Sequence, residues 1–199
     1  MRTLKLVASL ATTLALAACG GPAAQDEQLA TSSAALTSGV SQGCLFNISY
    51  RQKPGTLPPL YEVVVTRDAT GCAWGGGSVV LGTSYNTPAL SLAANNLGVA
   101  ASFTSKGTPS GSAAIFVYLR HLAPDTLSVV RATIIGAMNS GYAGYVYSGE
   151  LSILSNGTTL EVRGTKSGVI PGETDSGSNY IATYPNFFTS TTSPTIVAY

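Results

Sequence analysis

The sequence predicts an all-β fold, either a single antiparallel β-sandwich or a small closed barrel, rich in hairpins and holding one disulfide. Short apolar runs recur about every ten residues and are separated by Gly, Pro, Asn, Asp and Ser, as in antiparallel strands joined by turns. No segment beyond residue 18 carries apolar residues at the helical period for three turns. Charged residues make up 10% of the chain, against about 25% in a typical soluble domain. Small and polar residues dominate instead, as in secreted β-rich proteins.

The first 18 residues have the composition of a secretion signal. Arg2 and Lys5 form a short basic region, and residues 6–18 carry no charge. This apolar stretch is shorter than the ~20 residues that a membrane-spanning helix needs. We therefore expect a signal peptide over residues 1–18.

At the end of this stretch, Leu16, Ala17, Ala18 and Cys19 resemble the lipobox of bacterial lipoprotein precursors, in which Leu and two small residues precede a Cys. The resemblance covers the first 20 residues. It implies that the Cys19 thiol receives a diacylglycerol, that the leader is cut before Cys19, and that the new amino group takes a fatty acid such as palmitate. Several acyl chains make a stable membrane anchor, whereas one is marginal. In this family the absence of an Asp at Gly20 implies sorting to the outer membrane.

The alternative for the leader is an ordinary secretory signal in which Cys19 is a bystander. In both cases, residues 19–42 are rich in small and polar residues and lack a sustained apolar period. This composition predicts a flexible tether. The β-rich domain is then expected over residues 43–199.

Two cysteines, Cys44 and Cys72, remain once Cys19 carries lipid. An even pair in an oxidising cell envelope is expected to form one disulfide. The flanking segments GCLFN and TGCAWGG supply no His for a catalytic cysteine.

Three apolar runs open the predicted domain. Residues 44–50 alternate between apolar and polar, so that Cys44 points into the core. Residues 60–67 are rich in Val and follow two prolines, which cannot continue a central strand. Residues 78–85 form the third run.

Further strands are expected in pairs that form hairpins, followed by one closing strand. These segments are residues 88–94 with 97–103, 112–122 with 126–135, 149–154 with 159–164, and finally 195–199. In the last pair, Asn156 and Gly157 match the two positive-φ positions of a type I′ turn. Residues 165–180 are expected to form a long polar loop.

The charge balance argues against a nucleic-acid partner. Ten Lys and Arg stand against nine Asp and Glu in the whole chain, and loss of Arg2 and Lys5 with the leader leaves eight against nine. Nucleic-acid binders carry a clustered basic stripe. Only the pair Arg51 and Lys53 comes near to one.

No catalytic group, metal site or cofactor motif is predicted. His121, the only histidine of the chain, is expected to have a structural role in a strand. Residues 173–178, ETDSGS, resemble the signature around the nucleophile of chymotrypsin-like serine proteases, with Ser176 in the place of the nucleophile. Thr174 replaces the first Gly of that signature, and triads are recognised by geometry rather than by a tetrapeptide. Calcium ligation by the oxygens of this loop is the other alternative, although the spacing is not that of an EF-hand.

The candidate ligand-binding residues are Tyr142, Tyr145 and Tyr147. Exposed rings on a β-sheet stack on sugar faces or form protein interfaces, so a polysaccharide or an envelope protein is the expected partner. The alternative is packing within strands, because Tyr is a good strand former. Tyr145 and Tyr147 share one face of their strand, so one interpretation should hold for both.

The sequence as a whole favours a non-enzymatic binding or structural β-domain that an N-terminal lipid holds at the cell envelope. Two alternatives stay open. An outer-membrane β-barrel is suggested by Val197 and Tyr199 in the last strand. A hydrolase acting on envelope polymers would need carboxylates gathered in a cleft. The candidates are Glu150, Glu161, Glu173 and Asp175.

Overall fold

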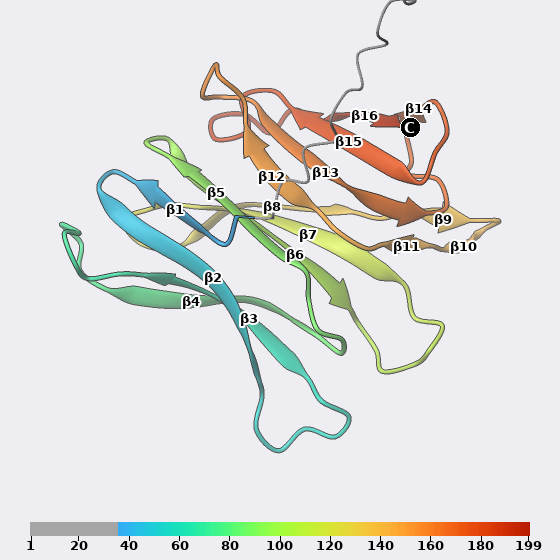
Figure 1. The fold of residues 1–199 in the computed structure, drawn as a ribbon, viewed down its shortest axis with the longest axis horizontal. Helices are drawn as coiled ribbons and strands as arrows, with labels where there is room; N and C mark the ends of the chain where they lie inside the picture. Colours follow the sequence, from blue (N-terminus) through green and yellow to red (C-terminus); the bar gives the residue numbers. More distant parts are fainter. Residues whose placement is uncertain (1–35) are drawn as a thin grey trace, which may run out of the picture. The chain divides into compact units, whose positions relative to one another are not determined.

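The structure is a computed structural model that describes residues 36–199, in which every regular element is a strand (Figure 1). The strands are β1 (Ser38–Ser41), β2 (Cys44–Gln52), β3 (Tyr61–Arg67), β4 (Gly77–Ser84), β5 (Leu90–Asn95), β6 (Gly98–Lys106), β7 (Ile115–Leu122), β8 (Val129–Ile135), β9 (Met138–Asn139), β10 (Tyr142–Ala143), β11 (Tyr145–Val146), β12 (Glu150–Ile153), β13 (Leu160–Ser167), β14 (Glu173–Thr174), β15 (Asn179–Tyr184) and β16 (Thr195–Ala198). The predicted signal peptide, the lipobox with Cys19 and most of the predicted tether lie outside the described residues.

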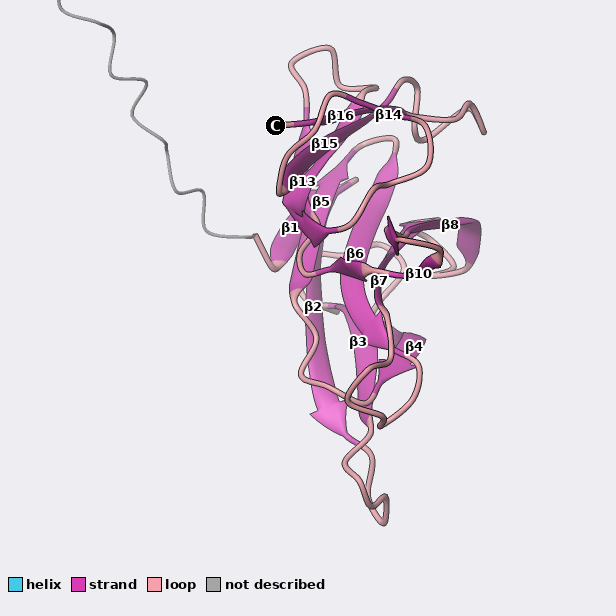
Figure 2. Ribbon diagram, turned by 90° about the vertical axis from the view of Figure 1, so that its right-hand side faces the viewer, coloured by secondary structure: helices cyan, strands magenta, loops and turns pink. Residues whose placement is uncertain are grey.

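The strands are arranged in three layers (Figures 1 and 2). The first layer is the antiparallel sheet β1-β2-β3-β4. The second contains β5, β6, β7 and β8, and the third contains β11 to β16. The sheets of the described residues do not close into a barrel, so the predicted sandwich is the architecture that forms. The all-β prediction is confirmed, and the third layer is an addition to it.

The second and third layers are parts of one hydrogen-bonded sheet. Its order is β14-β16-β15-β13-β11-β7-β6-β5, with β8 added at β7 and β12 at β13. The sheet folds over at β11, where Tyr145 pairs with Ile115 of β7 in parallel and with Ser167 of β13 in antiparallel fashion. This fold-over places β13 and β15 across one face of the second layer.

Strand β6 lies in the centre and is buried on both faces, from Gly98 to Ser105. Ala101 faces the core that β6 shares with the first layer, which includes Phe46. Ala100 faces the core shared with the third layer, which includes Val162. Because successive side chains of a strand point to opposite faces, one strand serves two cores. Its small residues leave room for both.

The disulfide between Cys44 and Cys72 is present, as predicted. The two Cα atoms lie 4.6 Å apart, and Cys44 is completely buried in the core between the first two layers. The bridge joins residues that are 28 positions apart. In the chain-entropy model, a loop of this length stabilises the fold by roughly 3 to 4 kcal/mol.

The folded part begins earlier than the sequence predicted. Residues Ser38–Ser41, placed in the tether, form strand β1 and pair with β2. Leu36 O also accepts a hydrogen bond from Leu92 N at 2.7 Å. The segment has no apolar alternation because it is a short edge strand with largely exposed side chains, so its composition resembles that of a linker.

The predicted hairpins are confirmed, but the type I′ turn in the last one is wrong. Gly157 has a φ of +70°, whereas Asn156 does not adopt a positive φ. Gly157 N donates to Leu154 O at 2.9 Å, and Asn156 Oδ1 accepts from Thr158 N and Thr159 N at 3.1 and 3.0 Å. The Asn156 side chain accepts both of these hydrogen bonds. The loop between β12 and β13 is therefore longer than a two-residue turn, and only Gly157 needs a positive φ.

The long polar loop predicted over residues 165–180 is partly strand. β13 continues to Ser167, the short β14 pairs in parallel with β16, and β15 begins at Asn179. Lys166 points inward and meets Glu173 at 2.9 Å, with side chains that are 2% and 3% exposed. A buried charge requires a partner. This ion pair therefore fixes the path of the loop, which its Gly-rich composition did not predict.

Two substitutions test the burial of β6 on both faces. Ala100→Leu and Ala101→Leu each add bulk to a different core, and each should lower the free energy of unfolding by about 1 to 3 kcal/mol. Ala132→Leu is the control, since Ala132 lies exposed on the edge strand β8 and should change stability little. Urea unfolding measures all three. Full tolerance of either core substitution would contradict the three-layer arrangement.

Candidate ligand-binding face

The outward side of the third layer carries the candidate site. In β13, β15 and β16 the even-numbered side chains, such as Val162 and Tyr180, are buried in the core, and the odd-numbered ones point outward. In β11, Val146 is buried and Tyr145 points outward. We call one part of this outward surface the tyrosine face, which comprises Tyr145, Tyr147, Arg163, Thr165, Asn179, Ile181, Val197 and Tyr199.

One row of this face has a tyrosine at each end. Tyr147 N donates to Thr165 O at 2.9 Å, and Thr165 is paired with Asn179. Asn179 and Tyr199 exchange two backbone hydrogen bonds of 3.0 Å each. Three strand spacings separate the two tyrosines, which is about 14 Å. The two residues are 48% and 56% exposed, with a hydroxyl and an amide side chain between them.

A second row, next to the first, combines an arginine with two apolar residues. Arg163 pairs with Ile181, and Ile181 pairs with Val197, which is exposed. Arg163 Nη2 contacts Glu161 Oε2 at 2.6 Å. A surface ion pair of this kind contributes about 0 to 1 kcal/mol to stability, but it offsets the positive charge. The centre of the tyrosine face therefore presents aromatic, apolar and neutral polar groups.

Tyr145 and Tyr147 lie on the same face, as expected. Their rings stack with centroids 5.9 Å apart and an angle of 6° between the planes. Tyr142 lies elsewhere, because it belongs to the separate two-stranded ribbon β9–β10, where it pairs with Asn139. Tyr142 is 80% exposed. The structure thus groups two of the three candidate tyrosines on the tyrosine face and leaves Tyr142 outside it.

A buried phenol supports the position of Tyr147. Tyr180 points inward below the face, and its hydroxyl donates to Ser148 O at 2.8 Å. Burial raises the pKa of Tyr180 well above its usual value, so the phenol stays protonated and remains a donor. Gly164 leaves space for the same carbonyl, because a Cβ there would collide with Ser148 O. The chain is thus fixed directly after Tyr147.

The face contains residues that the sequence did not single out as ligand-binding candidates. Thr165, Asn179 and Tyr199 come from three different strands, and only the register of β13, β15 and β16 brings them into one row with Tyr147. The alternation in the last strand was a usable signal for Tyr199, since it separates Tyr199 from the buried Ala198. Nothing local marks Thr165 or Asn179.

His121 is a buried residue of strand β7. Its ring lies beside the core between the second and third layers. The ring centroid is 5.9 Å from that of Phe187 and 5.2 Å from that of Phe188. Ser176 is exposed in the loop between β14 and β15. Within residues 36–199, no hydrogen bond joins the two side chains, and the arrangement does not form a protease triad.

Two of the four candidate carboxylates are held in ion pairs. Glu173 is bound by Lys166 and accepts a hydrogen bond from Ile170 N at 3.0 Å. Glu161 is bound by Arg163, which also faces Glu150 across the β12–β13 pair. In the described part of the chain, no group of three or more His, Cys, Asp or Glu is placed to hold a metal ion.

A groove of about 500 Å³ lies at the edge between β8 and β16. Its lining includes Thr133, Ile134, Ile170, Tyr184, Pro194 and Ile196. Burial raises the pKa of Tyr184 to about 12, so the phenol is neutral at physiological pH. Small-molecule sites have volumes of roughly 300 to 1,000 Å³. The groove therefore has the size of a small-molecule site.

Comparison of the chain with protein-family models, with curated proteins and with solved structures gives no match. Among residues 36–199 there is no helix with the length and hydropathy needed to cross a membrane.

The burial of His121 predicts a dependence of stability on pH. Burial lowers the pKa of His121, and the neighbouring charge of Arg131 lowers it further. The unfolded chain therefore takes up a proton near pH 6.5 that the folded protein does not. The stability that the neutral, buried His121 contributes is complete above about pH 6.5. It is lost as the pH falls, at up to about 1.4 kcal/mol per pH unit. Urea unfolding between pH 7.5 and 5.5 measures this effect. The free energy of unfolding should fall with falling pH in the wild type, and it should fall less in His121→Gln. An equal pH dependence in the two proteins would contradict the prediction.

Proposed function

We propose that the protein is a lipid-anchored component of the cell envelope whose β-domain binds a ligand without catalysing a reaction. The tyrosine face carries the binding part of the proposal, because it presents two exposed rings with neutral polar side chains between them. The lipobox at residues 16–19 supports the anchor, and the disulfide agrees with an oxidising compartment. Outer-membrane sorting is part of the same proposal.

The anchor depends on one thiol. In a bacterial host fed with labelled palmitate, the wild-type chain should incorporate label and fractionate with membranes, whereas Cys19→Ala should do neither. The variant also should keep its uncut leader, which a mass measurement detects. A labelled Cys19→Ala chain, or an unlabelled wild-type chain, would contradict the anchor.

We propose an uncharged polysaccharide of the envelope as the ligand class. Aromatic rings present large, rigid apolar faces on which sugar rings stack. Hydroxyl and amide groups, such as those of Thr165 and Asn179, donate and accept hydrogen bonds with sugar hydroxyls. Since Tyr147 and Tyr199 lie about 14 Å apart across the strands, a linear polymer that crosses the sheet would contact both rings.

Substitutions at the two ends of the row test this site. We expect Tyr147→Ala and Tyr199→Ala each to cost about 1 to 2 kcal/mol of binding, which is about a fivefold to thirtyfold weaker affinity. Tyr142→Ala is the matched control, since it removes an exposed ring outside the tyrosine face. Binding is measured with a secreted form of residues 34–199, the unit that contains all the sheets, against a panel of envelope polysaccharides.

Three results would contradict the proposed site. Loss of affinity in Tyr142→Ala equal to that in Tyr147→Ala would place the ligand elsewhere. Affinity that does not rise with oligosaccharide length would contradict a ligand contacting both rings. Polymer that is shortened during the assay would contradict a non-enzymatic role.

A further inference from the structure

The hairpin of β2 and β3 projects beyond the sheets and has an apolar tip. Figures 1 and 2 show its loop at the end of the domain that lies away from β15 and β16. Residues 53–60 form this loop. Leu57 lies in it with 95% of its surface exposed, more than any other large apolar residue in the described part of the chain. Single exposed apolar residues are common, so the surroundings of Leu57 decide whether its exposure has a use.

The loop that presents Leu57 is fixed by hydrogen bonds. Thr56 Oγ1 donates to Lys53 O at 2.9 Å and accepts from Leu60 N at 3.1 Å. Lys53 N also donates to Leu60 O at 2.8 Å, which closes the base of the loop. Three prolines restrict the backbone further. Leu57 therefore projects from a preformed loop. Its insertion into an apolar environment would require little additional ordering of the loop backbone.

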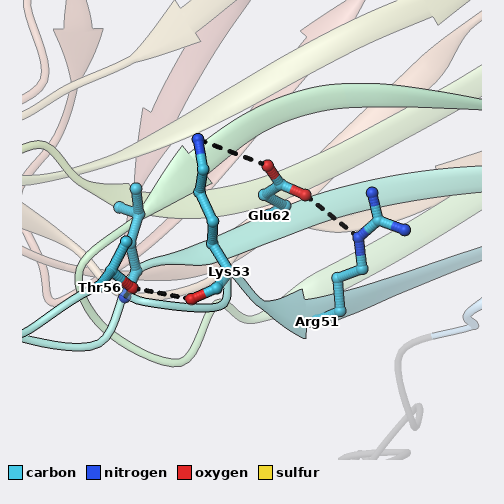
Figure 3. Close-up of polar contacts among 5 residues, drawn as sticks. Arg51, Lys53, Thr56 and Glu62 are labelled. Atoms are coloured by element: carbon cyan, nitrogen blue, oxygen red, sulfur yellow. Dashed lines mark hydrogen bonds and ion pairs between the residues drawn. The ribbon is translucent and has the colours of Figure 1, made fainter.

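Arg51 and Lys53 lie on one side of the hairpin, with the carboxylate of Glu62 between them (Figure 3). Arg51 and Lys53 contact Glu62 at 3.1 and 3.9 Å, with side chains that are 66% and 52% exposed. These three are the only charged residues between positions 50 and 62, so the hairpin end carries a net charge of +1. One carboxylate cannot neutralise two cations. The exposed Arg51 and Lys53 side chains therefore remain available to an anionic surface.

Two tyrosines occupy the other side of the hairpin. The register pairs Arg51 with Glu62 and Gln52 with Tyr61, which places Tyr50 and Tyr61 on the face opposite the cations. Their rings meet edge to face with centroids 5.5 Å apart. Tyr50 is exposed. Tyrosine is enriched at the boundary between lipid headgroups and acyl chains, since its ring is apolar and its hydroxyl is polar.

We propose that this tip inserts into the interface of an anionic lipid bilayer. Leu57 would reach the acyl boundary, Tyr50 and Tyr61 would lie at headgroup level, and Arg51 and Lys53 would approach lipid phosphates. The inference rests on the proposed function, because the Cys19 lipid would hold the domain at the membrane and raise the effective concentration of the tip there. Since the tip lies at the end of the domain away from β15 and β16 (Figure 1), insertion would direct these two strands of the tyrosine face away from the membrane.

The test measures the depth of a tryptophan at the tip. The full chain carrying Leu57→Trp is produced with its lipid and reconstituted into phosphatidylglycerol-containing vesicles whose acyl chains are brominated, which quenches indole at the acyl boundary. Leu97→Trp is the matched control, because Leu97 is an exposed leucine in the β5–β6 turn. Trp74 is common to both variants and to the wild type, so its signal is subtracted.

We expect several-fold stronger quenching and a blue shift for Leu57→Trp relative to Leu97→Trp. Addition of Arg51→Gln and Lys53→Gln, or replacement of the anionic lipid by phosphatidylcholine, should reduce both signals while the protein still floats with the vesicles. Equal quenching at the two positions in an anchored chain would overturn this inference alone. A chain that carries no lipid and does not float would overturn the anchor and this inference together. A tip that is buried only after envelope proteins are added would also overturn it, in favour of a protein partner.

Discussion

The arrangement of the domain depends on the burial of β6 on both faces. A strand that serves two cores must be narrow, and Ala100, Ala101 and Ser102 are small enough for a layer to approach from either side. The approach is completed by polar contacts, in which Ser102 Oγ donates to Gly149 O and Ser91 Oγ accepts from Leu151 N. These bonds satisfy buried groups of the third layer that would otherwise be costly. The same contacts fix β12, and through it β13, above the second layer.

The position of the tyrosine face follows from this constraint. Once β13 and β15 lie on the second layer, strand alternation directs Val162, Tyr180 and Ala182 into the core and the intervening side chains outward. The register between strands then aligns Tyr147 with Tyr199, although they are far apart in the sequence. The first layer, the disulfide and the projecting β2–β3 hairpin lie on the opposite side of β6. The two proposed contacts of the domain, with a ligand and with lipid, thus use separate parts of it.

Local patterns in the sequence predicted most strands, the hairpins and the disulfide, because alternation and turn residues are properties of short segments. They missed β1, whose side chains are largely exposed, and the three-layer arrangement, in which one parallel pairing between Tyr145 and Ile115 joins the second layer to the third. The buried pair of Lys166 and Glu173 was also invisible, since charged residues in a Gly-rich segment resemble a loop. For the site, Tyr145 and Tyr147 were identified from their spacing. Thr165 and Asn179 were not, because register between distant strands leaves no local signal.

Amide hydrogen exchange measured residue by residue tests the central claim most directly. If β6 is the strand on which both cores depend, its amides should exchange only through global unfolding and be among the slowest in the domain. The amides of the edge strand β4 and of the β2–β3 loop should exchange much faster through local opening. Exchange in β6 as fast as in β4, or slow exchange confined to one of the two outer layers, would contradict the three-layer account and the placement of the tyrosine face that follows from it.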